Sequence, residues 1–543
     1  MEMLEEDIYL PPGSARLLSA EESVLVLIPE PTADPNDPLN WTLPRKYVNT
    51  LFVLAVTVAV FAAMTMQMVF WQQMTVELGM TYDELNAGVS FNVVGLALGC
   101  LCIIPFTKKY GRRSTYIFST AVMAATSWWS SRMRTVPEMY ITNFLFGLAG
   151  STNETIAEMT IADLFFVHQR GLANGFYITS VMIGNFLAPT LAGIQAASMG
   201  WRWAYYTVGI ILTILFLLFL LFFEETKYVP VSVGVSTVGD PDLQETQNKL
   251  RKAKSNATAS PPANHKQLFE KRGDQDVEQI MPPVPLPNKY RQRMRFSTPP
   301  EEPLLSTYIA PFKMAVFPHV VFSAIQCANA VAFLVLLTSI NSIVFAAQPY
   351  DFSTAGVGLM LIGPFIGNMI GSVYGGIFGD WIVVRLARKN RGIFEPEMRL
   401  YVLFVPALLM GVGVAIFGIT VDRGMHWVYP SIGGALFAFG TSSMMDVSFT
   451  IVIDTYKATT AESFVFITFI RNAATIGVPF AVVPWLDSMS LTNISIICGC
   501  VTTSICFLFI PLLIWGRDIR VALHARYDRL VAETQDVGGS ERT

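Results

Sequence analysis

The segment Tyr47–Phe70 reads YVNTLFVLAVTVAVFAAMTMQMVF and contains no Asp, Glu, Lys or Arg. A helix needs roughly 20 apolar residues to cross the hydrocarbon core of a lipid bilayer. Because this stretch is long enough and carries no charge, it predicts a transmembrane helix. The same test, applied to the rest of the chain, predicts the fold.

Eleven further apolar stretches follow, and a long polar segment divides the whole set into six and six. They are, in order, Ala87–Phe106, Thr115–Ser131, Met139–Ile161, Leu172–Ala196, Trp203–Phe223, Phe317–Phe345, Ala355–Phe378, Leu400–Val421, Trp427–Ile451, Phe464–Pro484 and Ile494–Trp515. Two six-helix halves with a site between them are typical of secondary transporters. We therefore expect an all-α membrane protein with twelve transmembrane helices in two pseudo-symmetric six-helix bundles.

The composition agrees with a chain that lies mostly in a membrane. Charged residues make up 14% of the chain, whereas soluble proteins average about 25%. The chain has no Gly-x4-Gly-Lys-Ser/Thr loop, so ATP-driven pumping is not supported. Its six cysteines lie in or beside the apolar stretches without metal-ligand spacing. We expect no enzyme activity, cofactor, bound metal or nucleic-acid partner.

The pattern divides the chain into five parts. We predict an N-terminal tail (residues 1–46), a six-helix bundle (47–223), a linker (224–312), a second six-helix bundle (313–515) and a C-terminal tail (516–543). The linker is rich in Pro, Ser, Lys and Glu. Such a composition buries too little apolar surface to fold, so we expect it to be mostly disordered.

The short loops predict the orientation. If the N-terminus is cytoplasmic, the loops on that side contain far more basic residues than those on the other side. The cytoplasmic set is Lys108, Lys109, Arg112, Arg113, Arg170, Arg385, Arg388, Lys389, Arg391, Arg399 and Lys457, and the opposite set is Arg132, Arg134, Arg202 and Arg423. An excess of Lys and Arg marks the cytoplasmic side, so we expect both termini in the cytosol.

Four local motifs link the chain to a known family. They are Asp34–Trp41 (DPNDPLNW), Ile161–Gly171 (IADLFFVHQRG), Gly200–Trp203 (GWRW) and Arg391–Leu400 (RGIFEPEMRL). With these motifs the chain resembles the major facilitator superfamily, in particular the twelve-span drug:proton antiporter branch of fungi. The resemblance implies a monomer with a central cavity, which works by alternating access.

The resemblance also implies a cytoplasmic gate of ion pairs. The gate residues at matching positions are Gly111, Arg112, Arg113, Asp163, Arg170, Asp380 and Arg385. Lys108 stands where the family has an Asp, and Ile104 where it has a Gly. Since Lys108 cannot accept a hydrogen bond, we expect Arg112 to pair with Asp163 or with backbone carbonyls at a helix end. Asn143 stands where the family's fourth span often has an arginine that is tied to proton coupling.

Two rows of small residues predict close helix packing. The fifth span contains Gly184, Ala188, Pro189 and Gly193, and the eighth contains a glycine at every fourth position, including Gly367, Gly371 and Gly375. Small residues at this spacing let two helices approach closely. In the family these spans meet between the bundles, so we expect Gly184 and Ala188 to face the Gly367–Gly375 row. Pro189 lacks an N–H and is expected to kink its helix.

Charged residues inside the spans are the strongest site candidates, because a membrane charge is costly unless it faces a partner or a cavity. Glu154 and Arg471 lie deepest, and we expect both to face the central cavity. Glu158 and Asp446 are interpreted as residues of the cytoplasmic interface. Five polar residues are weaker cavity candidates: Gln67, Asn185, Asn329, Asn341 and Asn472. Asn493 begins the one glycosylation motif predicted on the outer side.

These residues favour a plasma-membrane carrier that exports small amphipathic or cationic organic compounds in exchange for protons. Burial raises the pKa of a carboxyl group, so a buried acid can carry a proton. The expected partners are the organic substrate, protons and the lipid bilayer. Two alternatives stay open: proton-coupled uptake of a small cationic nutrient, and a non-transporting nutrient sensor on the same fold. A flux assay separates a carrier from a sensor.

Overall fold

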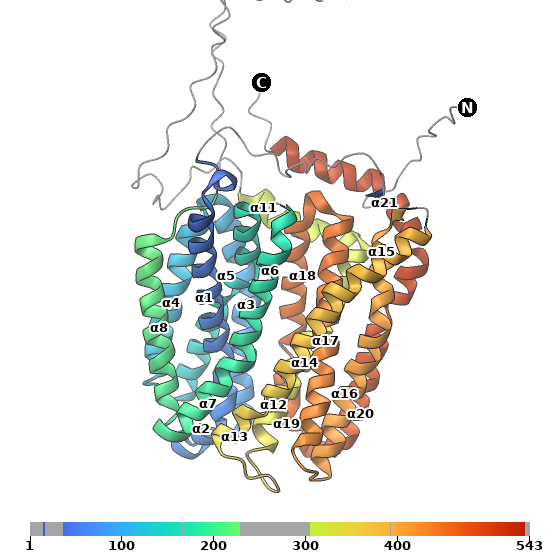
Figure 1. The fold of residues 1–543 in the computed structure, drawn as a ribbon. Coiled ribbons are helices and arrows are strands. Elements are labelled where there is room, and N and C mark those ends of the chain that lie inside the picture. The colour runs from blue at the N-terminus through green and yellow to red at the C-terminus, as the bar shows by residue number, and fades with distance from the viewer. Residues whose placement is uncertain (1–14, 17–35, 166, 228–303, 391, 538–543) are drawn as a thin grey trace, which may run out of the picture.

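The computed structural model describes residues 15–16, 36–165, 167–227, 304–390 and 392–537. These residues form two helical bundles that stand side by side (Figure 1). We call the end where α11 and α21 lie the terminal end, and the end where α2 and α13 lie the loop end.

The first bundle follows the six predicted spans in order. After the short 3-10 turn η1 (Pro38–Asn40), its helices are α1 (Leu43–Thr65), η2 (Met66–Phe70), α2 (Trp71–Leu78), α3 (Tyr82–Tyr110), α4 (Arg112–Ser130), α5 (Val136–Leu164), α6 (Val167–Met182), the π-turn η3 (Ile183–Leu187), α7 (Ala188–Met199) and α8 (Trp201–Phe222). The π-turn ends two residues before Pro189, whose missing N–H interrupts the regular helical hydrogen bonds at this point.

The second bundle begins after the linker. Its helices are α11 (Leu304–Lys313), η4 (Met314–Val316), α12 (Pro318–Val344), α13 (Thr354–Leu359), α14 (Ile362–Val373), the π-turn η5 (Tyr374–Phe378), α15 (Gly379–Lys389), η6 (Pro396–Leu403), α16 (Phe404–Asp422), α17 (Val428–Thr455), η7 (Lys457–Thr459), α18 (Thr460–Thr475), α19 (Val478–Ser488), α20 (Leu491–Cys506) and α21 (Phe509–Val537). Two short strands, β1 (Ala15–Arg16) and β2 (Ile393–Phe394), pair antiparallel.

Within the described residues, 10 helical stretches are long and apolar enough to cross a membrane. The other two predicted spans correspond to α4 and α5, which are helical but carry many Ser, Thr and Asn side chains. The polar side chains of α5 are mostly buried against neighbouring helices. A Cβ on Gly147 of α5 would overlap the backbone of α3 at Asn92. Close packing therefore shields much of the polar surface of α5 inside the bundle.

The predicted partner of the glycine row on α14 is wrong. A Cβ on Gly367 would overlap the backbone of Ala435, and one on Gly371 would lie 2.9 Å from the Cα of Phe439, both on α17. Gly184 faces Phe61 and Val58 of α1 instead. The rows do permit close approach, but to the neighbouring helix of the same bundle. The spacing of small residues predicts a flat helix face, and it does not specify which helix covers that face.

The fifth and eighth spans do touch, mainly nearer the loop end, where α7 meets α13 (Figure 1), and to a smaller extent where η3 meets α14. The Thr190 hydroxyl donates to the Gly358 carbonyl over 2.8 Å. A Cβ added to Gly193 would lie only 2.8 Å from the Thr354 carbonyl oxygen, because the backbones of α7 and α13 lie so close together. The Gln73 amide also donates to the Thr354 hydroxyl over 3.1 Å. These contacts join the two bundles at this end.

The predicted linker and tail are only partly described. Residues 228–303 lie outside the described residues, and residues 304–313 form helix α11. The predicted C-terminal tail continues α21 as a helix to Val537. Its Tyr527 ring packs against Phe317 and Tyr456, and the buried Arg520 guanidinium donates to Glu397 over 2.7 and 2.8 Å. The first part of this segment is therefore anchored to the second bundle.

Candidate functional site

A cavity of about 270 Å³ lies between the two bundles. Its wall combines side chains from α1, α3, α5, α6 and η3 of the first bundle with others from α12, α14, α17 and α18 of the second. One water occupies only about 10–15 Å³ by a comparable measure. The cavity therefore has room for a small organic molecule.

Most of the predicted polar cavity residues line this space. Gln67, Asn185, Asn341 and Asn472 belong to its wall. Asn329 does not, because its amide points into the second bundle and donates to the Cys506 sulfur of α20 over 3.5 Å. The sequence placed Asn329 on a membrane helix, but its position around that helix decides whether it faces the cavity.

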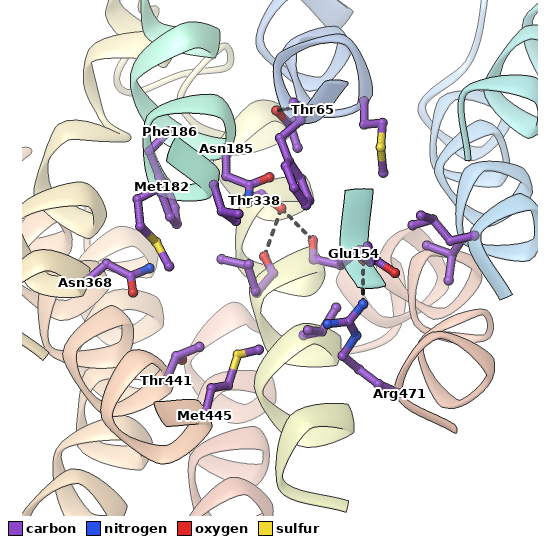
Figure 2. Close-up of a pocket in the computed structure, with 18 of the residues that line it drawn as sticks. Thr65, Glu154, Met182, Asn185, Phe186, Thr338, Asn368, Thr441, Met445 and Arg471 are labelled. Carbon is purple, nitrogen blue, oxygen red and sulfur yellow. Dashed lines mark hydrogen bonds and ion pairs between the residues drawn. The ribbon is translucent and has the colours of Figure 1, made fainter. Parts of the chain in front are cut away.

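The cavity wall contains an ion pair that joins the two bundles. Glu154 of α5 contacts the Arg471 guanidinium of α18, and their side chains are only 9% and 11% exposed. Figure 2 shows the two groups facing each other across the boundary. Asn472 extends the contact, since its amide donates to the Glu154 carboxylate over 2.9 Å and its oxygen accepts from Arg471 over 3.1 Å. Each charge therefore has a partner in a site with little water.

Glu158 and Asp446 lie in a different place from the one predicted. We expected both at the cytoplasmic interface, but both line the cavity. Glu158 follows Glu154 by four residues on α5, so the two carboxylates share a face. Asp446 lies on α17, in the wall that belongs to the second bundle. The cavity extends further toward the terminal end than the span boundaries suggested, and this extension brings the two acids into it.

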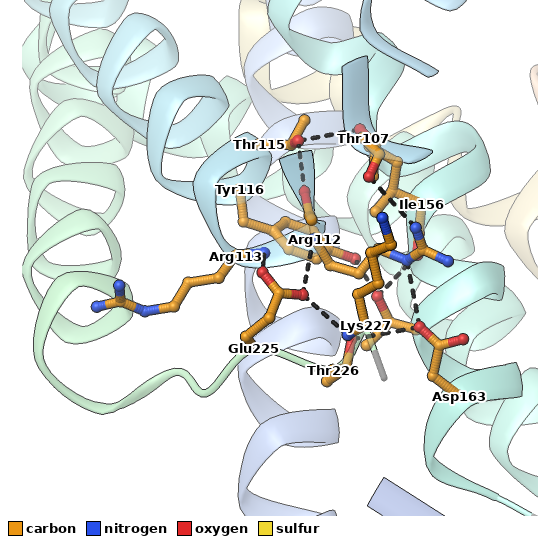
Figure 3. Close-up of polar contacts among 12 residues, drawn as sticks. Thr107, Arg112, Arg113, Thr115, Tyr116, Ile156, Asp163, Glu225, Thr226 and Lys227 are labelled. Atoms are coloured by element: carbon orange, nitrogen blue, oxygen red, sulfur yellow. Dashed lines mark hydrogen bonds and ion pairs between the residues drawn. The ribbon is translucent and has the colours of Figure 1, made fainter. Parts of the chain in front are cut away.

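The predicted gate residues of the first bundle form a polar cluster at the terminal end. Arg112 at the start of α4 pairs with Asp163 of α5, with 3.2 Å between Nε and Oδ2. Arg112 also donates to the Thr107 carbonyl over 3.3 Å. The buried Arg113 extends in the opposite direction (Figure 3) and donates to the carbonyls of Phe223 and Leu220, each over 2.8 Å.

Sequence reasoning missed Glu225, which completes this cluster. Its carboxylate accepts the backbone N–H groups of Arg112 over 2.9 Å and of Arg113 over 3.1 Å (Figure 3). A carboxylate at this position satisfies the unpaired N–H groups of the α4 N-terminus and complements the helix dipole. Gly111 has φ 111°, and a Cβ there would collide with Glu225. The glycine is therefore what leaves room for the cap.

The second bundle has a related cluster around a residue that was not among the gate candidates. Arg399 donates to Asp380 over 2.7 Å and to Asp454 over 2.6 Å. Arg385 lies 5.2 Å from the centre of the Trp381 ring, an arrangement that allows a cation–π contact. The side chain of Arg170 lies outside what the structure describes. In both clusters, the described arginine–carboxylate pairs tie together helices of one bundle.

Comparisons with known proteins agree with this architecture. A family model described as the Major Facilitator Superfamily matches residues 53–479. An uncharacterized MFS-type transporter of Schizosaccharomyces pombe is 29% identical, over 92% of this chain and 90% of its own. Protein HOL1 of Saccharomyces cerevisiae is 27% identical, over 93% and 92%. The efflux pump bik6 of Gibberella fujikuroi is 25% identical, over 90% and 93%.

A solved structure has a similar fold. It is the xylose transporter XylE from E. coli in a partially occluded, inward-open conformation, with a TM-score of 0.55 and 14% identity. The match covers 86% of this chain and 99% of that one. The family model spans most of the chain, and the relatives in fungi align along nearly its whole length. This protein is therefore a multi-pass membrane protein that belongs to the Major Facilitator Superfamily.

Proposed function

We propose that this protein is a secondary active transporter that exports small amphipathic or cationic organic compounds in exchange for protons. The observation that carries the proposal is the cavity between the bundles, with the Glu154–Arg471 ion pair in its wall. A transporter that works by alternating access rocks its two halves around a central site. Any such movement must change a contact that joins the two halves at that site.

The contacts at the loop end support a conformation that is closed on that side. Thr190, Gly193 and Gln73 of the first bundle contact α13 of the second. Toward the other end, the cavity wall extends to Asp446, Phe449 and Phe464. With both termini in the cytosol, as the basic loops favour, substrate enters this conformation from the cytoplasm and leaves after the loop end opens.

The lining of the cavity supports an amphipathic or cationic substrate. Apolar side chains such as Phe61, Met182 and Phe186 form much of the wall. The charged lining groups are Glu154, Glu158, Asp446 and Arg471, so carboxylates outnumber the single guanidinium. The relative named an efflux pump aligns over 90% of this chain and 93% of its own, which is consistent with export. We place the protein in the plasma membrane as a monomer.

The test of this proposal is a flux assay with purified protein in liposomes. Vesicles are loaded with rhodamine 6G, an amphipathic fluorescent cation, and the external medium is then acidified. Proton antiport predicts faster dye efflux than in protein-free vesicles, and an ionophore that collapses the pH gradient should remove the difference. Acid-driven dye uptake would instead favour the proton-coupled importer. A lack of protein-dependent flux for this and other cations would contradict the carrier and favour the sensor.

Replacing Arg112 with Ala is expected to leave the protein folded and to slow transport several-fold. The guanidinium pairs with Asp163 at the terminal end, while the Glu225 cap contacts only the backbone N–H of Arg112 and survives the change. An ion pair near the surface contributes about 0–1 kcal/mol to stability, so folding should tolerate its loss. The measurement is the initial rate of dye efflux at equal protein content.

Arg423→Ala serves as the control for this experiment, because Arg423 is an exposed arginine at the loop end. The gate hypothesis for Arg112 fails if both variants transport at the wild-type rate. It also fails if Arg112→Ala markedly lowers the thermal unfolding temperature of the protein. The loss of transport would then follow from a structural role of the arginine.

A further inference from the structure

We propose that the wall formed by α14 and α17 contains a binding subsite for an ammonium group that carries N–H donors, with Asp446 at its centre. The inference rests on the proposed function only in that the substrate enters this cavity. It adds a specific recognition element on the side of the cavity opposite the Glu154–Arg471 pair. It also narrows the substrate class to primary and secondary organic amines in their protonated form.

Asp446 is a partly exposed acid in the wall of a ligand-sized space, and one of its oxygens lies against α14. Its side chain lines the cavity, and its Oδ2 atom is buried without a hydrogen-bond donor among the described residues. Ser372 of α14 is a polar neighbour of this carboxylate, but a neutral hydroxyl does not neutralise its charge. A Cβ on Gly375 would lie 3.2 Å from the Asp446 Cβ. The glycine therefore lets α14 lie directly behind the acid and supports its position.

Two further acceptors lie along the same wall. Asn368 is 4% exposed, lines the cavity and has an Oδ1 atom without a donor in the described part of the chain. It precedes Ser372 by four residues, so both lie on one face of α14. Ser442 precedes Asp446 by four residues on α17, and its buried hydroxyl also lacks a partner there. Buried polar groups normally have partners, so this row of oxygens favours a ligand with several donors.

The charges around the cavity also favour a cation at this wall. Figure 2 shows Asn368, Thr441 and Met445, the neighbour of Asp446, across the cavity from Glu154 and Arg471. Arg471 is already paired with Glu154. Glu158 makes no hydrogen bond or ion pair with the described residues, although it lies within electrostatic range of Arg471. With all four groups ionised, the lining has a formal charge of −2, which a cationic substrate would reduce.

The need for N–H donors separates this subsite from general cation binding. A quaternary ammonium ion has the same charge as a primary one, but it cannot donate a hydrogen bond to the Asp446 carboxylate or to the Asn368 amide oxygen. It would leave both acceptors buried and unpaired, and a site that is built to hydrogen-bond a group discriminates strongly against an analogue without it. A site built as an aromatic cage would bind the quaternary ion as well, because it recognises the positive charge without needing N–H donors.

The experiment compares three probes of similar shape by calorimetry on the full-length purified protein. They are phenethylammonium, its N,N,N-trimethyl derivative and the neutral 2-phenylethanol. Wild-type protein is expected to bind phenethylammonium about 10-fold to 100-fold more tightly than either of the other probes. This is the loss of affinity expected when a ligand cannot form charge-assisted hydrogen bonds with the site. Asp446→Asn should remove most of this preference. Asp487→Asn, at an exposed acid outside the cavity, is the matched control and should keep it.

Thermal unfolding of each variant shows that the protein is folded before binding is measured. Equal affinity for the primary and quaternary ions would overturn the subsite, and so would an unchanged preference in Asp446→Asn or no binding of any ammonium probe by the wild type. Asn368→Ala is a second test variant. It should weaken the binding of phenethylammonium more than the binding of its trimethyl derivative. The flux assay is read separately. Acid-driven export of a neutral compound with no ammonium binding would leave the transporter standing and remove only this subsite.

Discussion

Replacing Glu154 with Gln is expected to reduce pH-driven transport to the level of protein-free vesicles, with substrate binding retained and a smaller loss of stability than removal of Arg471 causes. Gln keeps the size of the side chain and still offers an oxygen to the Asn472 amide, which donates to Glu154 over 2.9 Å in the wild type. It cannot bind or release a proton between pH 5 and 8. If Glu154 carries the coupled proton, the variant loses the proton exchange step. Substrate affinity should change by less than about 10-fold, because a neutral hydrogen bond replaces a charged one.

Arg471→Ala should have a broader effect than Glu154→Gln. It leaves the buried Glu154 carboxylate without its guanidinium partner, and breaking a buried pair from one side costs roughly 3–5 kcal/mol. The protein should therefore be less stable as well as inactive. The double change Glu154→Gln with Arg471→Gln removes both charges, so it should recover stability without recovering pH-driven flux.

Three measurements check these variants: the amount of protein at the membrane, the thermal unfolding temperature, and dye efflux as a function of external pH. Asp487→Asn is the control for the loss of a carboxyl group outside the cavity. An unchanged pH profile in Glu154→Gln would show that Glu154 has a structural role and that another group carries the proton. Equal thermal stability of Arg471→Ala and the wild type would contradict the importance of the ion pair for folding.

Gly367→Ala and Gly371→Leu are expected to prevent correct assembly of the second bundle. A Cβ at either position overlaps the backbone of α17, at Ala435 or at Phe439. Backbone atoms cannot rotate away as a flexible side chain can, so the two helices must separate. Overpacking costs typically 1–3 kcal/mol in soluble cores, and Leu is much larger than Ala. We expect a strong loss of surface protein for Gly371→Leu and a smaller one for Gly367→Ala.

Gly376→Ala is the matched control, since it changes a glycine of the same span with no heavy atom within 4 Å of the added Cβ. The fraction of monodisperse protein after detergent extraction measures assembly directly. Normal yield and transport in Gly371→Leu would show that α14 and α17 can separate freely, against the packing described here. A loss in Gly376→Ala as large as in Gly367→Ala would indicate that helix propensity, rather than packing, causes the defect.

The length and polarity of the apolar stretches predicted the helices, because a bilayer leaves few other ways to satisfy backbone hydrogen bonds. The depth of Glu154 and Arg471 within their spans indicated that each needs a partner or a cavity, since an isolated charge is costly there. Local chemistry was equally informative for Arg112. Lys108, four residues earlier in the chain, cannot accept a hydrogen bond. Asp163 on the neighbouring loop was therefore an expected partner, and the two residues pair at 3.2 Å.

Only the tertiary structure decided which surfaces these elements present to one another. The glycine row of α14 faces α17 and not the fifth span, Asn329 points away from the cavity, and Asp446 points into it. Glu225 caps α4 from a segment more than a hundred residues away in sequence. Sequence periodicity defines the faces of a helix, whereas its partner depends on how all the helices pack together. The position of the cavity follows from that packing, and so does the set of acids that a substrate would meet there.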